Sequence, residues 1–203
     1  MKSYQFQIVI AAMMVLVCPA AGFSLGEEQV TVTYKVIHTT RAGELISYAH
    51  YSVAAHEAEG YWLQRVISLT ADSKPLSIVQ ILLDRDTHQA RRYIMHRPAK
   101  MDQPPSVIDL PLDRMGKDEI LPMPLKAISG VREIIPTEFA EFDALKCSAK
   151  NSTIWLSAAV PVLGVVKVEH AEFTMTLSQI RDSARDLLSQ KPPKGGISYM
   201  TNK

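Results

Sequence analysis

The sequence predicts a mainly β protein: a curled antiparallel meander or incomplete β-barrel, with a long proline-rich crossing loop and a C-terminal amphipathic helix. Apolar and polar residues alternate with a period of two through most of the first hundred residues. Turn signals separate these stretches, whose starts lie about fifteen residues apart. Long twisted strands that follow one another along the chain tend to curl into a barrel or half-barrel.

The N-terminal residues 1–22 have the three-part pattern of a secretory signal peptide. Lys2 precedes an apolar run from Ile8 to Val17, and small residues follow around Ala21. A membrane-spanning helix needs about 20 apolar residues, and this run is only about half as long. Cys18 suggests a lipoprotein, but Val17 stands where lipid-attachment signals generally carry a small residue. We therefore predict cleavage near Ala21 and a periplasmic or secreted protein.

The remainder predicts a single β-rich domain over 23–190 and a flexible tail over 191–203. Cleavage would leave Cys147 as the one thiol, so an internal disulfide is excluded and stability must come from a core. The chain carries 22 basic and 21 acidic residues, dispersed along its length. Because nucleic-acid binding normally requires a basic face, no nucleic-acid partner is predicted.

The N-terminal half predicts five successive strands. Val30, Val32, Tyr34 and Val36 alternate with polar neighbours. The same pattern recurs over 45–53, 61–69, 76–84 and 91–97, with turn signals between the stretches. Short connections between such strands predict antiparallel hairpins.

The segment from Pro98 to Pro124 holds six of the twelve prolines. Proline lacks the N–H that a central strand requires, so the segment predicts a long irregular crossing. It also carries Met101, Met115 and Met123 among other apolar residues. An exposed loop of this kind would favour aggregation, so we expect it to cover the sheet, either as a plug completing the core or as a lid over a cavity.

Strands resume after Pro136, over 145–150, 154–157, 165–168 and 172–177. Pro161 and Gly164 interrupt the apolar run that begins at Ile154, which predicts a tight corner between two strands. Ile180, Ala184, Leu187 and Leu188 then follow at helical spacing, and this spacing predicts the terminal helix.

Motifs for catalysis are missing from the sequence: it has no Gly-x-Ser-x-Gly, phosphate-binding loop, His-Glu-x-x-His or Cys-x-x-Cys. Met95 and His96, with the methionines of the crossing segment, allow a soft-metal site as an alternative to apolar packing. Asp84, Asp86 and His88 allow an acid–base or cation site as an alternative to a solvated turn. We predict a non-enzymatic protein with no catalytic residue, metal or cofactor.

The stretches Leu145–Cys147, Trp155–Glu169 and Met175–Leu177 resemble the end of uncharacterised periplasmic β-sheet families that are similar in fold to the LolA/LolB lipoprotein carriers. The resemblance implies an incomplete barrel around an apolar cavity, with helices or a long loop as a lid. It also implies binding of acyl chains or partner proteins, and an arginine inside the cavity. Arg65 is the candidate, because it alternates with apolar residues, although the opposite face of its strand, with Trp62, could equally be the inner one.

The predicted function is therefore a non-catalytic periplasmic carrier of an apolar ligand such as a lipid or a lipoprotein acyl chain. The alternative is an envelope assembly or interaction protein that docks another protein through a sheet edge or the 98–124 loop. The candidate lining or lid residues are Trp62, Arg65, Met101, Met115, Met123, Trp155, Pro161 and Gly164.

Overall fold

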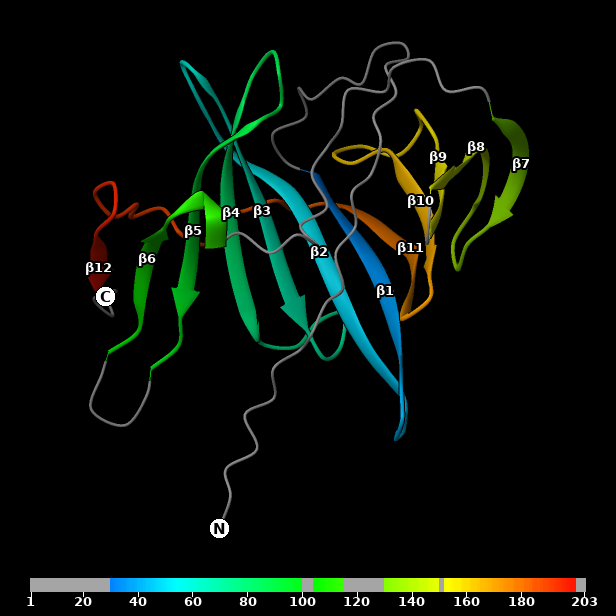
Figure 1. Ribbon diagram of the computed structural model, residues 1–203, viewed down its shortest axis with the longest axis horizontal. Coiled ribbons are helices and arrows are strands. Elements are labelled where there is room, and N and C mark those ends of the chain that lie inside the picture. The colour runs from blue at the N-terminus through cyan, green and yellow to red at the C-terminus, as the bar shows by residue number, and fades with distance from the viewer. Residues whose placement is uncertain (1–29, 100–103, 115–129, 150–151, 200–203) are drawn as a thin grey trace.

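A computed structural model describes residues 30–99, 104–114, 130–149 and 152–199. Twelve strands form one antiparallel sheet in the order β12-β6-β5-β4-β3-β2-β1-β11-β10-β9-β8-β7 (Figure 1). The strands are β1 Val30–Thr40, β2 Gly43–Glu57, β3 Gly60–Ser68, β4 Ser77–Asp84, β5 Ala90–Arg97, β6 Ser106–Leu110, β7 Val131–Pro136, β8 Glu141–Ala149, β9 Ser152–Leu156, β10 Val165–His170, β11 Phe173–Asp182 and β12 Ile197–Tyr199. The mainly β prediction is confirmed.

The sheet consists of two meanders joined at its centre. β1 to β6 follow one another as antiparallel neighbours, and so do β7 to β11. The two meanders meet where β1 pairs with β11, so the N-terminal strand lies in the middle of the sheet. The end strands β12 and β7 are not paired with each other, so the described sheet is open rather than a closed barrel.

The main core lies on the concave face of the sheet. Its contiguous cluster contains Tyr93 of β5 and Phe142 of β8, which lie far apart in the strand order. A cluster that joins such distant strands requires the sheet to curl around it. A smaller cluster lies on the convex outer face, where Trp62, Ile78 and Ile94 surround Leu188.

The sequence analysis predicted an irregular crossing without a strand over the proline-rich segment 98–124, and this prediction is wrong in part. Ser106–Leu110 forms β6, which pairs with β5 and also with β12. These five residues contain no proline, so each retains the N–H that a ladder needs. A short 3₁₀ turn, Leu112–Arg114, follows, and residues 115–129 lie outside the described part of the chain.

The predicted C-terminal helix is wrong, because the described residues contain no α-helix. Ile180, its first apolar position, belongs to β11 and pairs with Val32. After Asp182 the chain runs in an irregular course across the outer face of the sheet. In the predicted flexible tail, Ile197–Tyr199 forms β12, while the mobility of the tail stays a prediction. The described residues contain no helix of the length and apolarity needed to cross a membrane.

Candidate ligand-binding site

An apolar cavity of about 320 Å³ opens on the concave face between β1, β2, β3, β4 and β11. Ten of its fourteen lining residues are aliphatic, aromatic or methionine, and four are polar. The lining consists of Val36, His38, Leu45, Ile46, Ser47, Ala49, Tyr51, Arg65, Ile67, Leu69, Leu76, Ser77, Phe173 and Met175. Its volume is at the lower end of the range of about 300–1,000 Å³ that is typical of small-molecule sites.

Strand register brings these residues together from distant parts of the sequence. Val36 of β1 pairs with Ser47 of β2 on one side and with Met175 of β11 on the other. Two residues further along β1, His38 pairs with Leu45 and Phe173. Residues paired directly across antiparallel strands point to the same face, so these two rows form one wall of the cavity.

The second wall comes from β3 and β4. Ile67 pairs with Ala49 on β2 and with Ser77 on β4, which places all three side chains on the concave face. Arg65 lies two residues earlier on β3 and pairs with Tyr51. The wall is therefore apolar, with one guanidinium group and small hydroxyl groups set into it.

The polar lining residues differ in their charge. Burial lowers the pKa of His38, whose ring packs against Phe173. The imidazole is therefore neutral at neutral pH. Among the lining residues that the structure describes, Arg65 then carries the only formal charge, because none of the others is acidic or a lysine.

Large apolar side chains surround the opening of the cavity. Leu45 and Ile46 of β2 are 42% and 41% exposed, and Leu69 and Leu76, which flank the β3–β4 loop, are 55% and 50% exposed. All four also line the cavity. The apolar lining therefore includes residues exposed at the surface, which leaves an apolar ligand an entry path.

Among the predicted site residues that the structure describes, Arg65 is the one that lines this cavity. Trp62, which the sequence analysis placed beside it, lies on the opposite face of β3. Its ring packs in the outer cluster with Leu188, and its indole N–H donates to Glu57. The side chains of Arg92 and Lys191 lie over the ring, at 5.4 and 5.2 Å from its centre.

Trp155, Pro161 and Gly164 lie in the second meander, apart from the cavity. Trp155 is a buried residue of β9, and its indole N–H donates to Glu133 Oε2 at 2.9 Å. Pro161 and Gly164 form the corner between β9 and β10 that the sequence predicts. Gly164 has a φ of 68°, a left-handed conformation that glycine adopts without strain, and its carbonyl accepts the Ser157 N–H.

Met101, Met115 and Met123 lie outside the described residues, so their role as a lid stays a prediction. The sequence analysis missed the main lining residues, among them His38, Phe173 and Met175. Their alternation was visible, but the register that aligns β1 with β2 and β11 was not.

The alternative acid–base group, Asp84, Asp86 and His88, forms a structural turn. The Asp84 carboxylate accepts hydrogen bonds from the N–H groups of Thr87 and Asp86 and from the Thr87 hydroxyl. These hydrogen bonds, chiefly those from Thr87, hold the pKa of Asp84 well below its ordinary value. His88 Nδ1 lies 2.9 Å from the Tyr61 hydroxyl. Among the described residues, no three His, Cys, Asp or Glu side chains gather closely enough to hold a metal ion.

No protein-family model matches the chain, and no curated protein has a sequence that matches it.

Proposed function

We propose that the protein is a non-catalytic carrier that binds an apolar small molecule, such as an acyl chain, in the concave cavity. The observation that supports this proposal most directly is the continuous apolar lining from the cavity floor to its exposed rim. Burial of apolar surface supplies most of the affinity in such sites, and a few polar groups orient the ligand. The proposal includes export by the N-terminal signal sequence, which would place the carrier in the periplasm or outside the cell.

Arg65 suits a ligand that has an acidic end. Its guanidinium group offers several N–H donors in the planar arrangement that a carboxylate or phosphate accepts. The neighbouring apolar residues would hold the chain of the ligand, while Arg65 would hold its charged end. The ligand class is therefore an amphiphile with an acyl chain and an anionic head.

A binding measurement with a fluorescent fatty-acid probe tests this proposal. The wild-type protein should bind the probe, and Ser77→Phe should weaken binding roughly tenfold or more, because the ring fills part of the cavity. Ser148→Phe is the matched control, because Ser148 is an exposed residue of β8 outside the cavity lining. Equal binding by the two variants, or no binding by the wild type, would contradict the proposal.

Replacement of the arginine tests the ligand class. The wild-type protein should prefer the fatty acid over the corresponding fatty alcohol, and Arg65→Met should remove that preference. A hydrogen bond to a charged group contributes about 1.5–3 kcal/mol, which corresponds to a preference of roughly tenfold to a hundredfold. An unchanged preference in Arg65→Met would show that the guanidinium does not contact the head group, while leaving the apolar site intact.

A second candidate function is docking of another envelope protein at the β7 edge of the sheet. β7 pairs only with β8 among the described strands, and its Val131 and Ile134 are 68% and 61% exposed. An edge strand has unpaired backbone groups on its outer side and can accept a strand from a partner.

Site-specific photocrosslinking in the native envelope distinguishes this function from transport. A crosslinker at Ile134 should give a discrete protein adduct, and one at exposed Leu187, which lies on another part of the surface, should not. Val131→Lys should then abolish the adduct, because a charged edge strand disfavours strand addition. The absence of an adduct from Ile134 would exclude this edge as the docking site.

A further inference from the structure

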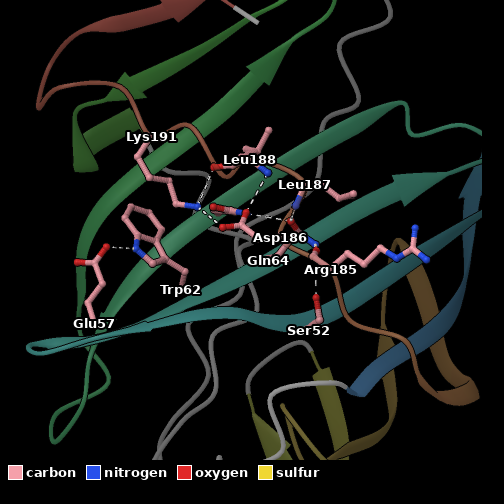
Figure 2. Close-up of polar contacts among 10 residues, drawn as sticks. Ser52, Glu57, Trp62, Gln64, Arg185, Asp186, Leu187, Leu188 and Lys191 are labelled. Carbon is pink, nitrogen blue, oxygen red and sulfur yellow. Dashed lines mark hydrogen bonds and ion pairs between the residues drawn. The ribbon is translucent and has the colours of Figure 1, made fainter. Parts of the chain in front are cut away.

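The residues that follow β11 cross the outer face of β3, β4 and β5, away from the cavity (Figure 2). We refer to residues 183–196 as the C-terminal segment. Apart from the short strand β12 beyond it, the segment is held to the described sheet largely by side chains of the sheet rather than by a backbone ladder. The outer face therefore recognises this segment in the way that a binding site recognises a peptide.

The side chain of Gln64 on β3 forms hydrogen bonds with the backbone of the segment. Its side-chain Nε2 donates to the Arg185 carbonyl at 2.9 Å, and its Oε1 accepts the Leu187 N–H at 3.0 Å. The residue is only 3% exposed. One buried amide thus satisfies both backbone groups that flank Asp186, as the neighbouring strand of a sheet would do.

The Asp186 carboxylate contacts both the sheet and its own segment. Gln80 Nε2 of β4 donates to Asp186 Oδ1 at 2.7 Å, and Lys191 of the same segment donates to Oδ2 at 2.7 Å. Oδ1 also accepts the Leu188 N–H at 2.9 Å. The carboxylate therefore orders the segment and binds it to the sheet at the same time (Figure 2).

Leu188 and Lys191 occupy two further subsites. The Leu188 side chain is 1% exposed and fills an apolar pocket that includes Trp62, Ile78 and Leu82. The Lys191 ammonium lies over the Trp62 ring at 5.2 Å from its centre, which is a cation–π geometry. Directly after Lys191, the Pro192 carbonyl accepts a hydrogen bond from the Arg92 guanidinium at 2.8 Å.

We propose that the outer face of β3–β5 is a recognition site for a peptide with the spacing Asp-x-Leu-x-x-Lys that turns directly after its aspartate. The chain's own residues 186–191 fill it in the described structure, and the same segment of a second copy can fill it in trans. The second copy is the fitting partner because it carries the sequence for which each subsite is shaped. This inference concerns the face opposite the cavity and does not depend on the proposed carrier function.

Exchange requires that the segment leave without disrupting the sheet. Its side-chain contacts lie on one face of β3–β6. Only the Gly196 carbonyl, which accepts the Asp109 N–H, and the three residues of β12 add backbone pairing, at the edge of the sheet. Loss of the Leu188 anchor should therefore open the site while the eleven other strands remain paired.

The test uses full-length protein and a fluorescent peptide of residues 183–199, which represents the segment of a second copy. Leu188→Asp in the protein should expel the protein's own segment and allow the peptide to bind, as measured by fluorescence anisotropy. The wild-type protein should bind the peptide roughly tenfold or more weakly, because its own segment competes at an effective concentration on the order of millimolar.

Two control peptides establish specificity. The peptide with Leu187→Asp should still bind, since Leu187 is 39% exposed, whereas the peptide with Leu188→Asp should not. Far-UV circular dichroism verifies that the protein variant is folded, and Leu188→Ala is the milder acceptor if Leu188→Asp is not. No binding to a folded acceptor, or equal binding of the two control peptides, would overturn the proposal.

Discussion

His50 is held between two hydroxyl groups on the outer face of the sheet. Ser68 donates its proton to the Thr70 carbonyl, so His50 Nε2 must donate to the Ser68 oxygen. His50 Nδ1, at 2.9 Å from the Thr33 hydroxyl, then accepts a hydrogen bond. This arrangement selects the Nε2–H tautomer of the neutral imidazole. Burial, aided by the positive charge of Arg181, lowers the pKa of His50, and the nearby Asp72 opposes this shift only in part.

A lowered pKa makes the stability of the folded state depend on pH. The folded protein disfavours the protonated imidazole, so the stabilising contribution of His50 is present above its ordinary pKa of 6.5 and is lost as the pH falls below it. We expect urea unfolding at pH 5.5 to give a lower free energy than at pH 7.5. In His50→Gln the decrease should be smaller but not abolished, because burial also lowers the pKa of His38 and His96. An identical pH dependence in the variant would contradict the assignment.

Gly60 begins β3 where the backbone of β4 comes very close. A Cβ atom at this position would overlap the carbonyl oxygen of Leu83, and a backbone atom in a paired strand cannot move aside easily. We expect Gly60→Ala to lower the free energy of unfolding by about 1–3 kcal/mol, as overpacking typically does. Ala58→Ser, at an exposed position of the same turn, should change it by less than about 0.5 kcal/mol. Chemical denaturation of the wild type and both variants measures these changes in the free energy of unfolding.

At the scale of elements, alternation predicted the strands well where the two faces of the sheet differ in polarity. β1 is the clearest case, since its buried Val32 and Tyr34 lie in the concave core. β7 was missed because it is a short edge strand with an exposed face, and Val131-Arg132-Glu133-Ile134 does not alternate. Local pattern carries little information where a strand has only one neighbour and little burial.

The incorrect helix has a different physical cause. The apolar residues from Ile180 to Leu188 match a helical period, but they serve two separate surfaces. Ile180 packs against the concave core, whereas Leu188 fills a pocket on the outer face. That pocket is formed by residues of β3, β4, β5 and β6, so no property of the segment itself could reveal it. Tertiary contacts decided the conformation here.

Two neighbouring leucines of the C-terminal segment, one buried and one exposed, allow a matched pair of alanine substitutions. Leu188→Ala should lower the free energy of opening the segment by about 2–5 kcal/mol, because it empties a buried pocket. Leu187→Ala should have little effect, since Leu187 is 39% exposed against 1% for Leu188. Limited trypsin digestion measures the difference through cleavage after Arg185, because the bond between Lys191 and Pro192 resists trypsin. Equal cleavage rates in the two variants would show that the pocket does not anchor the segment.

At the scale of the whole molecule, the cavity could be predicted only in part. The alternation of Arg65 with Leu63 and Ile67 was visible in the sequence, but the direction in which the sheet curls decides which face becomes the interior. That direction follows from the central β1–β11 pairing, which joins residues more than a hundred positions apart. The direction of curl also explains why Trp62 does not line the cavity. Trp62 lies on the convex side of β3, the strand that carries Arg65 on its concave side.

The two meanders are also joined through a buried side chain. The Tyr34 hydroxyl of β1 donates to the Val165 carbonyl of β10 at 2.9 Å, across the intervening β11. Tyr34 is fully buried, and burial raises its pKa well above the ordinary value, so its hydroxyl retains the proton it donates. With β1 at the centre of the sheet, neither meander can separate from the other without breaking this contact and the β1–β11 ladder.

This coupling predicts that the whole sheet unfolds in one transition. The chain has two tryptophans, Trp62 in the first meander and Trp155 in the second. Fluorescence of Trp62→Phe therefore reports the second meander, and that of Trp155→Phe reports the first. Two-state unfolding requires that both variants give sharp single transitions that match their circular dichroism.

Tyr34→Phe in each single-tryptophan background should lower the midpoints of both fluorescence transitions together. The expected loss is about 1–3 kcal/mol, because the Val165 carbonyl remains buried without its donor. Tyr48→Phe removes the same oxygen from a half-buried position of β2 and should cost no more than about 0.5 kcal/mol. If Tyr34→Phe shifted only the transition of one meander, the two halves would unfold independently. The β1–β11 ladder would then be a contact between two folding units rather than the centre of one.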